Sequence, residues 1–129
     1  MTFNGYHHIG LLVRDMEASL RFYTDGLGGT ETFSFPMGDS GKTIHMVDLG
    51  GNAVVELIPR GAEEAESHAR WAHIALRTDD ARAAYAKALE AGALSRTEPV
   101  DKHREGAAPT CNAFVLGPDG EVIELFEVK

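Results

Sequence analysis

The chain carries an internal repeat, and this repeat narrows the range of folds that it can adopt. The segment His8-Ile9-Gly10-Leu11 is echoed 65 residues later by His73-Ile74-Ala75-Leu76. The ends of the two copies also match, because Val54-Val55-Glu56-Leu57 resembles Val122-Ile123-Glu124-Leu125. The offset is 65 residues for the His segments and 68 for the Glu segments, and self-similarity at such a nearly constant offset indicates one structural module written twice.

Each copy is predicted to begin with a strand followed by a helix. Seven residues after each His stands an Asp, Asp15 or Asp80, which suits a helix N-cap. Apolar residues then recur at helical spacing, and glycines at 26, 28 and 92 are placed to end the two helices. The apolar positions are Met16, Leu20, Tyr23 and Leu27 in the first copy and Ala81, Ala84, Tyr85, Ala88 and Leu89 in the second.

Three short strands are expected after each helix. In the first copy they are residues 31–35, 43–49 and the strand with Glu56; in the second they are residues 95–100, 110–116 and the strand with Glu124. Gly117-Pro118-Asp119-Gly120 is a turn sequence that should join the last two strands as an antiparallel pair. The pattern is therefore βαβββ, twice.

The length supports one domain with one compact core. We expect a single α+β domain over residues 1–129, with module one at 1–59, a linker at 60–70 and module two at 71–129. The two tandem βαβββ modules should form a cupped mixed sheet with helices on the outer face.

Composition excludes several classes of protein. Hydrophobic residues at 43% and charged residues at 25% are ordinary for a globular protein. The net charge of -8 and the scattered basic residues argue against nucleic acid as a partner. No apolar run is long enough for a membrane span and no basic leader is present, so we expect a cytoplasmic protein. The single Cys111 is expected to be a small strand residue.

Two histidines and two glutamates stand where apolar residues would be expected. Strand alternation places Glu124 with Val122 and Phe126, on the face opposite Ile123 and Leu125. The same alternation applies to the other three residues, and all four fall on the face that the helices should not cover. A buried carboxylate needs compensation, which a divalent cation would supply. The predicted metal ligands are His8, Glu56, His73 and Glu124.

Imidazole nitrogens and carboxylate oxygens suit first-row divalent ions such as Ni²⁺, Co²⁺, Zn²⁺ or Fe²⁺. The sequence does not choose among these ions. It also leaves open whether the four ligands meet within one chain or across two chains. On the strand of residues 43–49, His45 shares the parity of Val47 and Leu49 and is a further candidate to line the cup.

The motifs resemble those of the vicinal-oxygen-chelate superfamily, and most closely glyoxalase I. The resemblance is carried in the first module by His8-x-Gly-Leu-x-Val-x-Asp15, Ser19-x-x-Phe22-Tyr23 and Gly26-Leu27-Gly28. In the second it is carried by Ala72-His73-Ile74-Ala75-Leu76 and by Pro118-Asp119-Gly120-x-x-Ile123-Glu124-Leu125. Ser19, Phe22 and Tyr23 are interpreted as helix-packing residues. The resemblance implies one divalent metal per site, Ni²⁺, Co²⁺ or Zn²⁺, usually in a homodimer.

The implied activity is that of lactoylglutathione lyase, which isomerises the hemithioacetal of methylglyoxal and glutathione. The metal would polarise the substrate oxygens and stabilise the enediolate, while a carboxylate moves the proton between adjacent carbons. Glu124 is the first candidate for this base, with Glu56 as its counterpart. The alternatives are an acyl-CoA epimerase, an extradiol dioxygenase, and a metal-free binding or resistance protein.

Two positions depart from the glyoxalase I pattern. Relatives of that type usually carry an Arg four residues beyond the first His and an Asn four beyond the first Glu, and both grip glutathione. Leu12 and Arg60 stand at these positions. Arg60, Lys102 and Arg104 are candidates to bind the substrate in their place.

Overall fold

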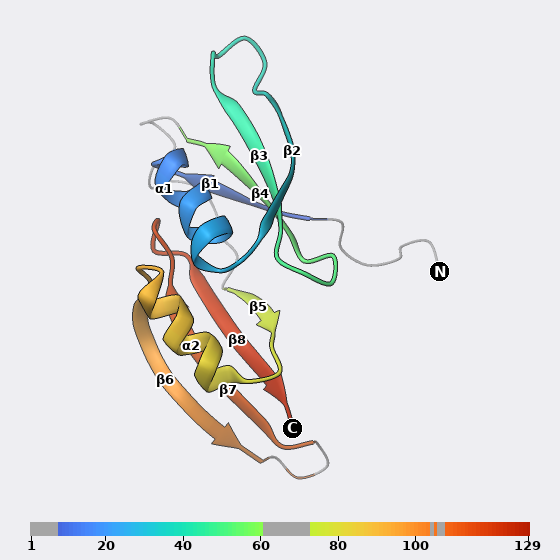
Figure 1. Ribbon diagram of the computed structural model, residues 1–129, viewed down its shortest axis with the longest axis vertical. Helices are drawn as coiled ribbons and strands as arrows, with labels where there is room; N and C mark the ends of the chain where they lie inside the picture. Colours follow the sequence, from blue (N-terminus) through green and yellow to red (C-terminus); the bar gives the residue numbers. More distant parts are fainter. Residues whose placement is uncertain (1–7, 61–72, 104, 106–107) are drawn as a thin grey trace, which may run out of the picture. The chain divides into compact units, whose positions relative to one another are not determined.

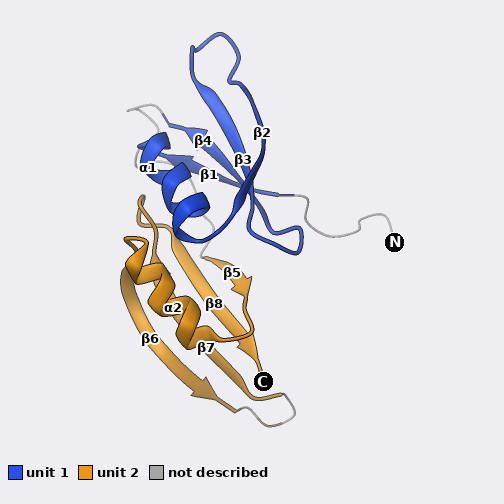
Figure 2. Cartoon of the chain, in the orientation of Figure 1, with its two compact units in different colours: residues 1–68 blue, residues 69–129 orange. Residues whose placement is uncertain are grey.

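The structure, a computed structural model, describes residues 8–60, 73–103, 105 and 108–129. The chain divides into two compact units, residues 1–68 and residues 69–129 (Figure 2). The expected linker at 60–70 lies outside the described residues, apart from Arg60. No helix in the described part of the chain is long and apolar enough to cross a bilayer.

Both units have the predicted element order βαβββ (Figure 1). The first unit contains β1 (Ile9–Val13), α1 (Met16–Arg21), the π-helical turn η1 (Phe22–Gly26), β2 (Thr30–Pro36), β3 (Thr43–Asp48) and β4 (Val54–Pro59). The second contains β5 (Ile74–Arg77), α2 (Ala81–Glu90), β6 (Leu94–Lys102), β7 (Thr110–Leu116) and β8 (Val122–Val128). The predicted α+β class and the two βαβββ modules are thereby confirmed.

Each unit forms one mixed four-stranded sheet with the same topology. The strand orders are β1-β4-β3-β2 and β5-β8-β7-β6. The first and last strands of each module run parallel, and the other neighbours are antiparallel. The register places Gly10 opposite Glu56 and Ala75 opposite Glu124. Matching topology and register therefore put the two glutamates at equivalent points of the two sheets.

The helix caps are those that the sequence predicts. The side chain of Asp15 accepts a hydrogen bond from the backbone N–H of Ala18 at 3.1 Å, and Asp80 accepts one from that of Ala83 at 3.0 Å. Gly92 follows α2 with a φ of 106°, in the left-handed region that favours glycine. The turn at 117–120 is closed by a bond from the Gly120 N–H to the Gly117 carbonyl, and it joins β7 to β8 as expected.

The edge strand β6 reaches Lys102, past the predicted end at Val100. Pro99 lies inside this strand, where the pairing with β7 shifts between Thr97 and Val100. Proline has no N–H to donate to a neighbouring strand, and it is tolerated at such edges and bulges. A proline inside a strand therefore also weakens the sequence signal for that strand.

Each sheet has one face covered by the helix of its unit. In the first unit, a Cβ on Gly29 would lie 2.6 Å from the Tyr23 carbonyl and 2.7 Å from Val47, so the end of η1 packs directly on β3. In the second, the N–H of Ala81 in α2 donates to Glu127 of β8 at 3.0 Å. In the first sheet, Val47 lies on the same face as the fully buried Leu57. In the second sheet, Glu127 lies on the same face as the fully buried Ile123. Glu56 and Glu124 therefore point to the opposite side, called here the helix-free face.

Candidate metal centre

The first pair of predicted ligands meets within the first unit. His8 immediately precedes β1, and its Nε2 lies 3.6 Å from Oε1 of Glu56 on β4. The Glu56 side chain is 18% exposed. Gly10, directly opposite Glu56, leaves space beside the carboxylate, because a Cβ there would stand 3.6 Å from Oε1. A small residue in β1 thus keeps this carboxylate accessible.

The second pair meets in the same way within the second unit. His73 immediately precedes β5, and its Nε2 lies 3.2 Å from Oε1 of Glu124 on β8. The ring of Phe114, which faces Glu124 across β7 and β8, packs edge-on against the imidazole at 5.7 Å. The other oxygen, Oε2, accepts a hydrogen bond from the side-chain amide of Asn112 at 2.8 Å. Glu124 is only 8% exposed, so its carboxylate is buried and held on both oxygens.

The donor atoms of each pair fit adjacent positions around a divalent ion. Two ligand atoms about 2.1 Å from an ion and at right angles to each other are about 3 Å apart. The observed separations of 3.6 Å and 3.2 Å are close to this value. In the part of the chain that the structure describes, no three His, Cys, Asp or Glu side chains gather at one point. Each unit therefore offers two ligands, and the set of four predicted from the sequence is untested.

Sequence reasoning missed Asn112. This residue is 8% exposed and lies on β7, among apolar residues on both sides. Its parity with Phe114 places it on the helix-free face with Glu124. The available signal was an amide in the middle of the apolar run Cys-Asn-Ala-Phe-Val, which is as unexpected as the carboxylate in β8.

A second residue that sequence reasoning missed is Arg77. It ends β5, opposite Phe126, and therefore shares the helix-free face with Glu124. It stands four residues after His73, as Leu12 stands four residues after His8. The guanidinium is exposed and makes no hydrogen bond or ion pair with the other described residues. The second module thus carries a cation where the first has an apolar side chain.

The expected substrate-binding residues are only partly placed. Arg60 follows β4 directly, and its backbone N–H continues the pairing with β1 by donating to the Val13 carbonyl at 3.1 Å. Lys102 ends β6 and contributes to a shallow depression of about 300 Å³. Arg104 lies outside the described residues. The other residues that line the depression are Asp101, His103, Pro109, Thr110 and Lys129.

His45 does not line the helix-free face, and the expectation that it could do so is wrong. It is paired with Leu57 in the register of β3 and β4, so it points to the helix-covered side. There its Nδ1 lies 2.5 Å from a carboxylate oxygen of Glu31 on β2. Both faces of β3 are apolar, with Ile44 and Met46 on one and Val47 on the other. Alternation alone could not tell which face receives the helix.

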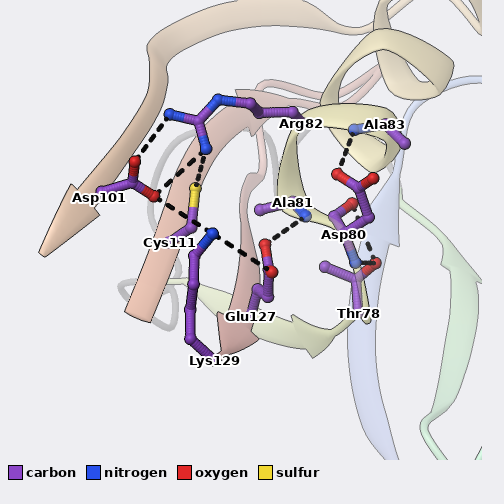
Figure 3. Close-up of polar contacts among 9 residues, drawn as sticks. All are labelled: Thr78, Asp80, Ala81, Arg82, Ala83, Asp101, Cys111, Glu127 and Lys129. Atoms are coloured by element: carbon purple, nitrogen blue, oxygen red, sulfur yellow. Dashed lines mark hydrogen bonds and ion pairs between the residues drawn. The ribbon is translucent and has the colours of Figure 1, made fainter. Parts of the chain in front are cut away.

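Cys111 belongs to a polar cluster on the helix-covered side of the second sheet (Figure 3). Its fully buried thiol accepts a hydrogen bond from Arg82 of α2 at 3.3 Å, and Arg82 also pairs with Asp101 at 3.1 Å. Burial, and then the hydrogen bond with Asp101, raise the pKa of the thiol. The hydrogen bond from Arg82 lowers the pKa of Asp101. A neutral buried thiol is a structural group, as expected from the sequence.

The duplicated βαβββ fold and its paired His and Glu residues define a class of two-module proteins, and comparison with known proteins gives the family. The family model of the Glyoxalase/Bleomycin resistance protein/Dioxygenase superfamily matches residues 5–125. The chain belongs to this superfamily.

Individual relatives cover nearly the whole chain. The uncharacterized protein YwbC of Bacillus subtilis (strain 168) is 32% identical over 122 residues, which span 93% of this chain and 94% of YwbC. The trypanothione-dependent glyoxalase I of Leishmania major is similar in structure, with a TM-score of 0.70, 23% identity, and coverage of 97% of this chain and 87% of that one. TnmS3, an antibiotic-binding protein from Streptomyces sp. CB03234, has a TM-score of 0.71 at 22% identity, with 100% and 99% covered. At these identities the two solved structures show the fold alone.

Proposed function

We propose that the protein is a metal-dependent lyase or isomerase of the glyoxalase I type. The observation that supports this most directly is the presence of two repeat-equivalent His and Glu pairs, one on the helix-free face of each sheet. The proposed ligands are His8, Glu56, His73 and Glu124. Binding of one ion by all four ligands requires one His and Glu pair from a first unit and one from a second unit. The two pairs would come from one chain or from the two chains of a homodimer.

The ion, Ni²⁺, Co²⁺ or Zn²⁺, would act as a Lewis acid on two neighbouring oxygens of a small substrate. The residues of the chain supply the rest of the chemistry. A carboxylate of Glu56 or Glu124 removes a proton from one substrate carbon and returns it to the adjacent carbon. The hemithioacetal of methylglyoxal and glutathione is the proposed substrate, and the cytoplasm is the proposed location.

Binding of an acidic substrate needs cations on the helix-free face. Arg77 supports this role because it is exposed and lies on the same face as Glu124. Arg60 directly follows β4, and strand alternation places it on the same face as Glu56. Lys102 ends β6, and its pairing with β7 places it on the same face as Asn112. A guanidinium can bind a carboxylate through two parallel hydrogen bonds. We therefore add Arg77 to Arg60, Lys102 and Arg104 as a candidate substrate-binding residue.

The test combines metal analysis with an activity assay. The purified protein is loaded with Ni²⁺, Co²⁺ or Zn²⁺ and mixed with methylglyoxal and glutathione, and thioester absorbance is followed. We expect tight metal binding and thioester formation. His73→Gln should weaken metal binding by more than about 100-fold, because loss of a residue behind a ligand already costs about 10- to 100-fold. His45→Gln is the matched control, since it removes a histidine from the helix-covered side, and it should bind metal normally.

The other outcomes are equally informative. Metal uptake without thioester formation would exclude glyoxalase I activity and retain the metal site. Oxygen consumption with catechols and Fe²⁺ would indicate a dioxygenase. Failure to take up any of these ions would refute the metal site and favour a metal-free binding protein.

A further inference from the structure

The strand register arranges the side chains on the helix-free face of the second unit in rows that cross the sheet. The row that contains Glu124 also holds its cross-strand neighbours Ala75, Phe114 and Thr97. The next row toward the end of β8 is Arg77, Phe126, Asn112 and Val100. The last row is Val128, Thr110 and Lys102. Glu124 therefore lies one row away from a guanidinium.

The two rows beyond Glu124, called here the outer rows, are uncharged in the middle and carry positive charge at their edges. Arg77 stands on the edge strand β5 and Lys102 on the opposite edge strand β6 (Figure 1). Between these two cations, the described residues of the outer rows include no charged side chain. Val128 is 54% exposed and Val100 is 49% exposed, and Phe126 is half-buried. The outer rows therefore form an accessible, largely apolar surface with a cation at each edge.

Arg77 is available to bind a ligand. Its guanidinium is exposed and makes no hydrogen bond or ion pair with the other described residues, although the chain has 20 acidic residues against 12 basic ones. Arg77 lies on the strand next to Glu124, two residues beyond Ala75, which is the register partner of Glu124. Strand spacings of about 4.8 Å across the sheet and about 3.3 Å per residue put the two Cα atoms roughly 8 Å apart. A group bound by Arg77 is thus only a few bonds away from a group bound beside Glu124.

We propose that the outer rows are specific for a small carboxylic acid with an uncharged, apolar body. Arg77 binds the carboxylate through two parallel hydrogen bonds, and Phe126 and Val128 contact the body. This inference rests on the proposed function, because it names the class of substrate for the same site. It makes Arg77 a specificity-determining residue, a role that Leu12, four residues after the His of the first unit, cannot fill.

Two features of the outer rows favour a small acid over a second copy of the chain as the occupant. Their apolar surface comes from three side chains, Phe126, Val128 and Val100, which is far less than the roughly 800 Å² per partner that a stable protein interface buries. The unpaired cation selects a ligand of opposite charge, and an uncharged body beside the Glu124 carboxylate avoids repulsion between like charges.

The acid site is tested on the metal-free protein, so that an ion does not contribute to binding. Titrations followed by backbone amide NMR compare hexanoate with hexanamide, which has the same apolar body and no charge. Hexanoate should bind about tenfold more tightly than hexanamide, because it gains a charge-assisted hydrogen bond with Arg77. Acetate should bind less tightly than hexanoate, because it lacks the apolar body. The signals that shift should belong to β5 and β8.

Substitutions at the two ends of the site separate the charged contact from the apolar one. Arg77→Gln should weaken hexanoate binding by about tenfold and leave hexanamide binding unchanged, and Arg77→Lys should recover part of the loss. Val128→Ser should weaken the binding of both six-carbon ligands and leave acetate binding unchanged. Arg96→Gln is the matched control, because Arg96 is an exposed arginine on β6 of the same unit, and it should bind hexanoate as the wild type does.

Equal affinities of the wild type for hexanoate and hexanamide would refute recognition of the acid, and wild-type hexanoate affinity in Arg77→Gln would refute the role of Arg77. A wild-type dimer that dissociates in Arg77→Gln, as measured by sedimentation, would show that a second copy occupies the outer rows and would overturn the proposal. Metal uptake by the wild type is measured separately. A protein that binds hexanoate but takes up no metal would overturn the proposed function and support the acid site, whereas one that takes up metal without binding hexanoate would overturn the acid site alone.

Discussion

Gly10 lets the β1 backbone lie close to the Glu56 carboxylate because it has no Cβ, and its substitution tests the geometry of the first pair. A Cβ at this position would lie 3.2 Å from the Cδ1 atom of Ile58 and 3.6 Å from Oε1 of Glu56. The contact with Glu56 is an ordinary van der Waals distance, and the contact with Ile58 is tight. Gly10→Ala therefore requires a shift of a few tenths of an ångström by the end of one flexible side chain.

The cost and the gain of Gly10→Ala nearly cancel. Moving Ile58 off its preferred rotamer costs about 0.5–1.5 kcal/mol, whereas replacing glycine inside a strand gains roughly 0.5–1 kcal/mol. The net change in the free energy of unfolding should stay within about 1 kcal/mol. Gly10→Val differs because its two Cγ atoms extend from the Cβ into the space that Ile58 and Glu56 occupy. It should weaken metal binding strongly.

Urea unfolding and Co²⁺ titration measure the two effects separately. We expect Gly10→Ala to unfold near the wild-type urea midpoint and to bind Co²⁺, and Gly10→Val to fold without binding Co²⁺ well. Ala75→Gly is the matched change in the second unit, where alanine already faces Glu124. A loss of more than about 2 kcal/mol in Gly10→Ala would refute the packing argument. Wild-type Co²⁺ affinity in Gly10→Val would refute the placement of the metal beside Glu56.

Three further results are expected. Arg77→Ala should raise the KM for an acidic substrate by about tenfold with little change in kcat, because it removes one charge-assisted hydrogen bond of roughly 1.5 kcal/mol. An unchanged KM in steady-state kinetics would show that Arg77 does not bind the substrate. The thiol of Cys111 should not react with Ellman's reagent in the folded protein at pH 8 and should react in denaturant, because it is buried with a raised pKa; rapid labelling of the folded protein would contradict this. The pKa of Asp101 is lowered in the folded protein by its hydrogen bond with Arg82. The ion pair therefore stabilises the fold fully at pH values above 3.8, the usual pKa of aspartate, and this stabilisation is lost as the pH falls through the lower pKa of the folded state. Urea midpoints of wild type and Arg82→Met should therefore converge in strong acid, and a difference that persists unchanged there would refute the linkage.

The fold could be predicted because its signals are local and occur twice. Asp15 and Asp80 cap their helices through contacts three residues away, and the turn before Gly120 is closed within four residues. Strand parity was enough to place Glu56 and Glu124 away from the helices, since each interrupts an apolar run.

The parts that escaped prediction depend on pairing between strands. His45 was assigned to the wrong face because β3 is apolar on both sides, and only its pairing with Leu57 fixes its direction. The hydrogen bond between Asn112 and Glu124 joins two strands across a turn. It can form only in the observed register of β7 and β8, which alternation along each strand does not specify. Partners across a sheet are thus harder to predict than caps within a helix.

Duplication explains how one sequence pattern can give two carboxylates with different surroundings. Equivalent backbone positions force Glu56 and Glu124 onto the helix-free faces, because moving either by one residue would place a charge against a buried helix. The neighbouring strand is under no such constraint. Ile44 and Asn112 occupy equivalent positions on that strand of the two sheets, and the Asn112 amide donates a hydrogen bond to its carboxylate whereas isoleucine has no donor. A pair of repeats can therefore keep its two ligand pairs in place while the freedom of one carboxylate is changed independently of the other.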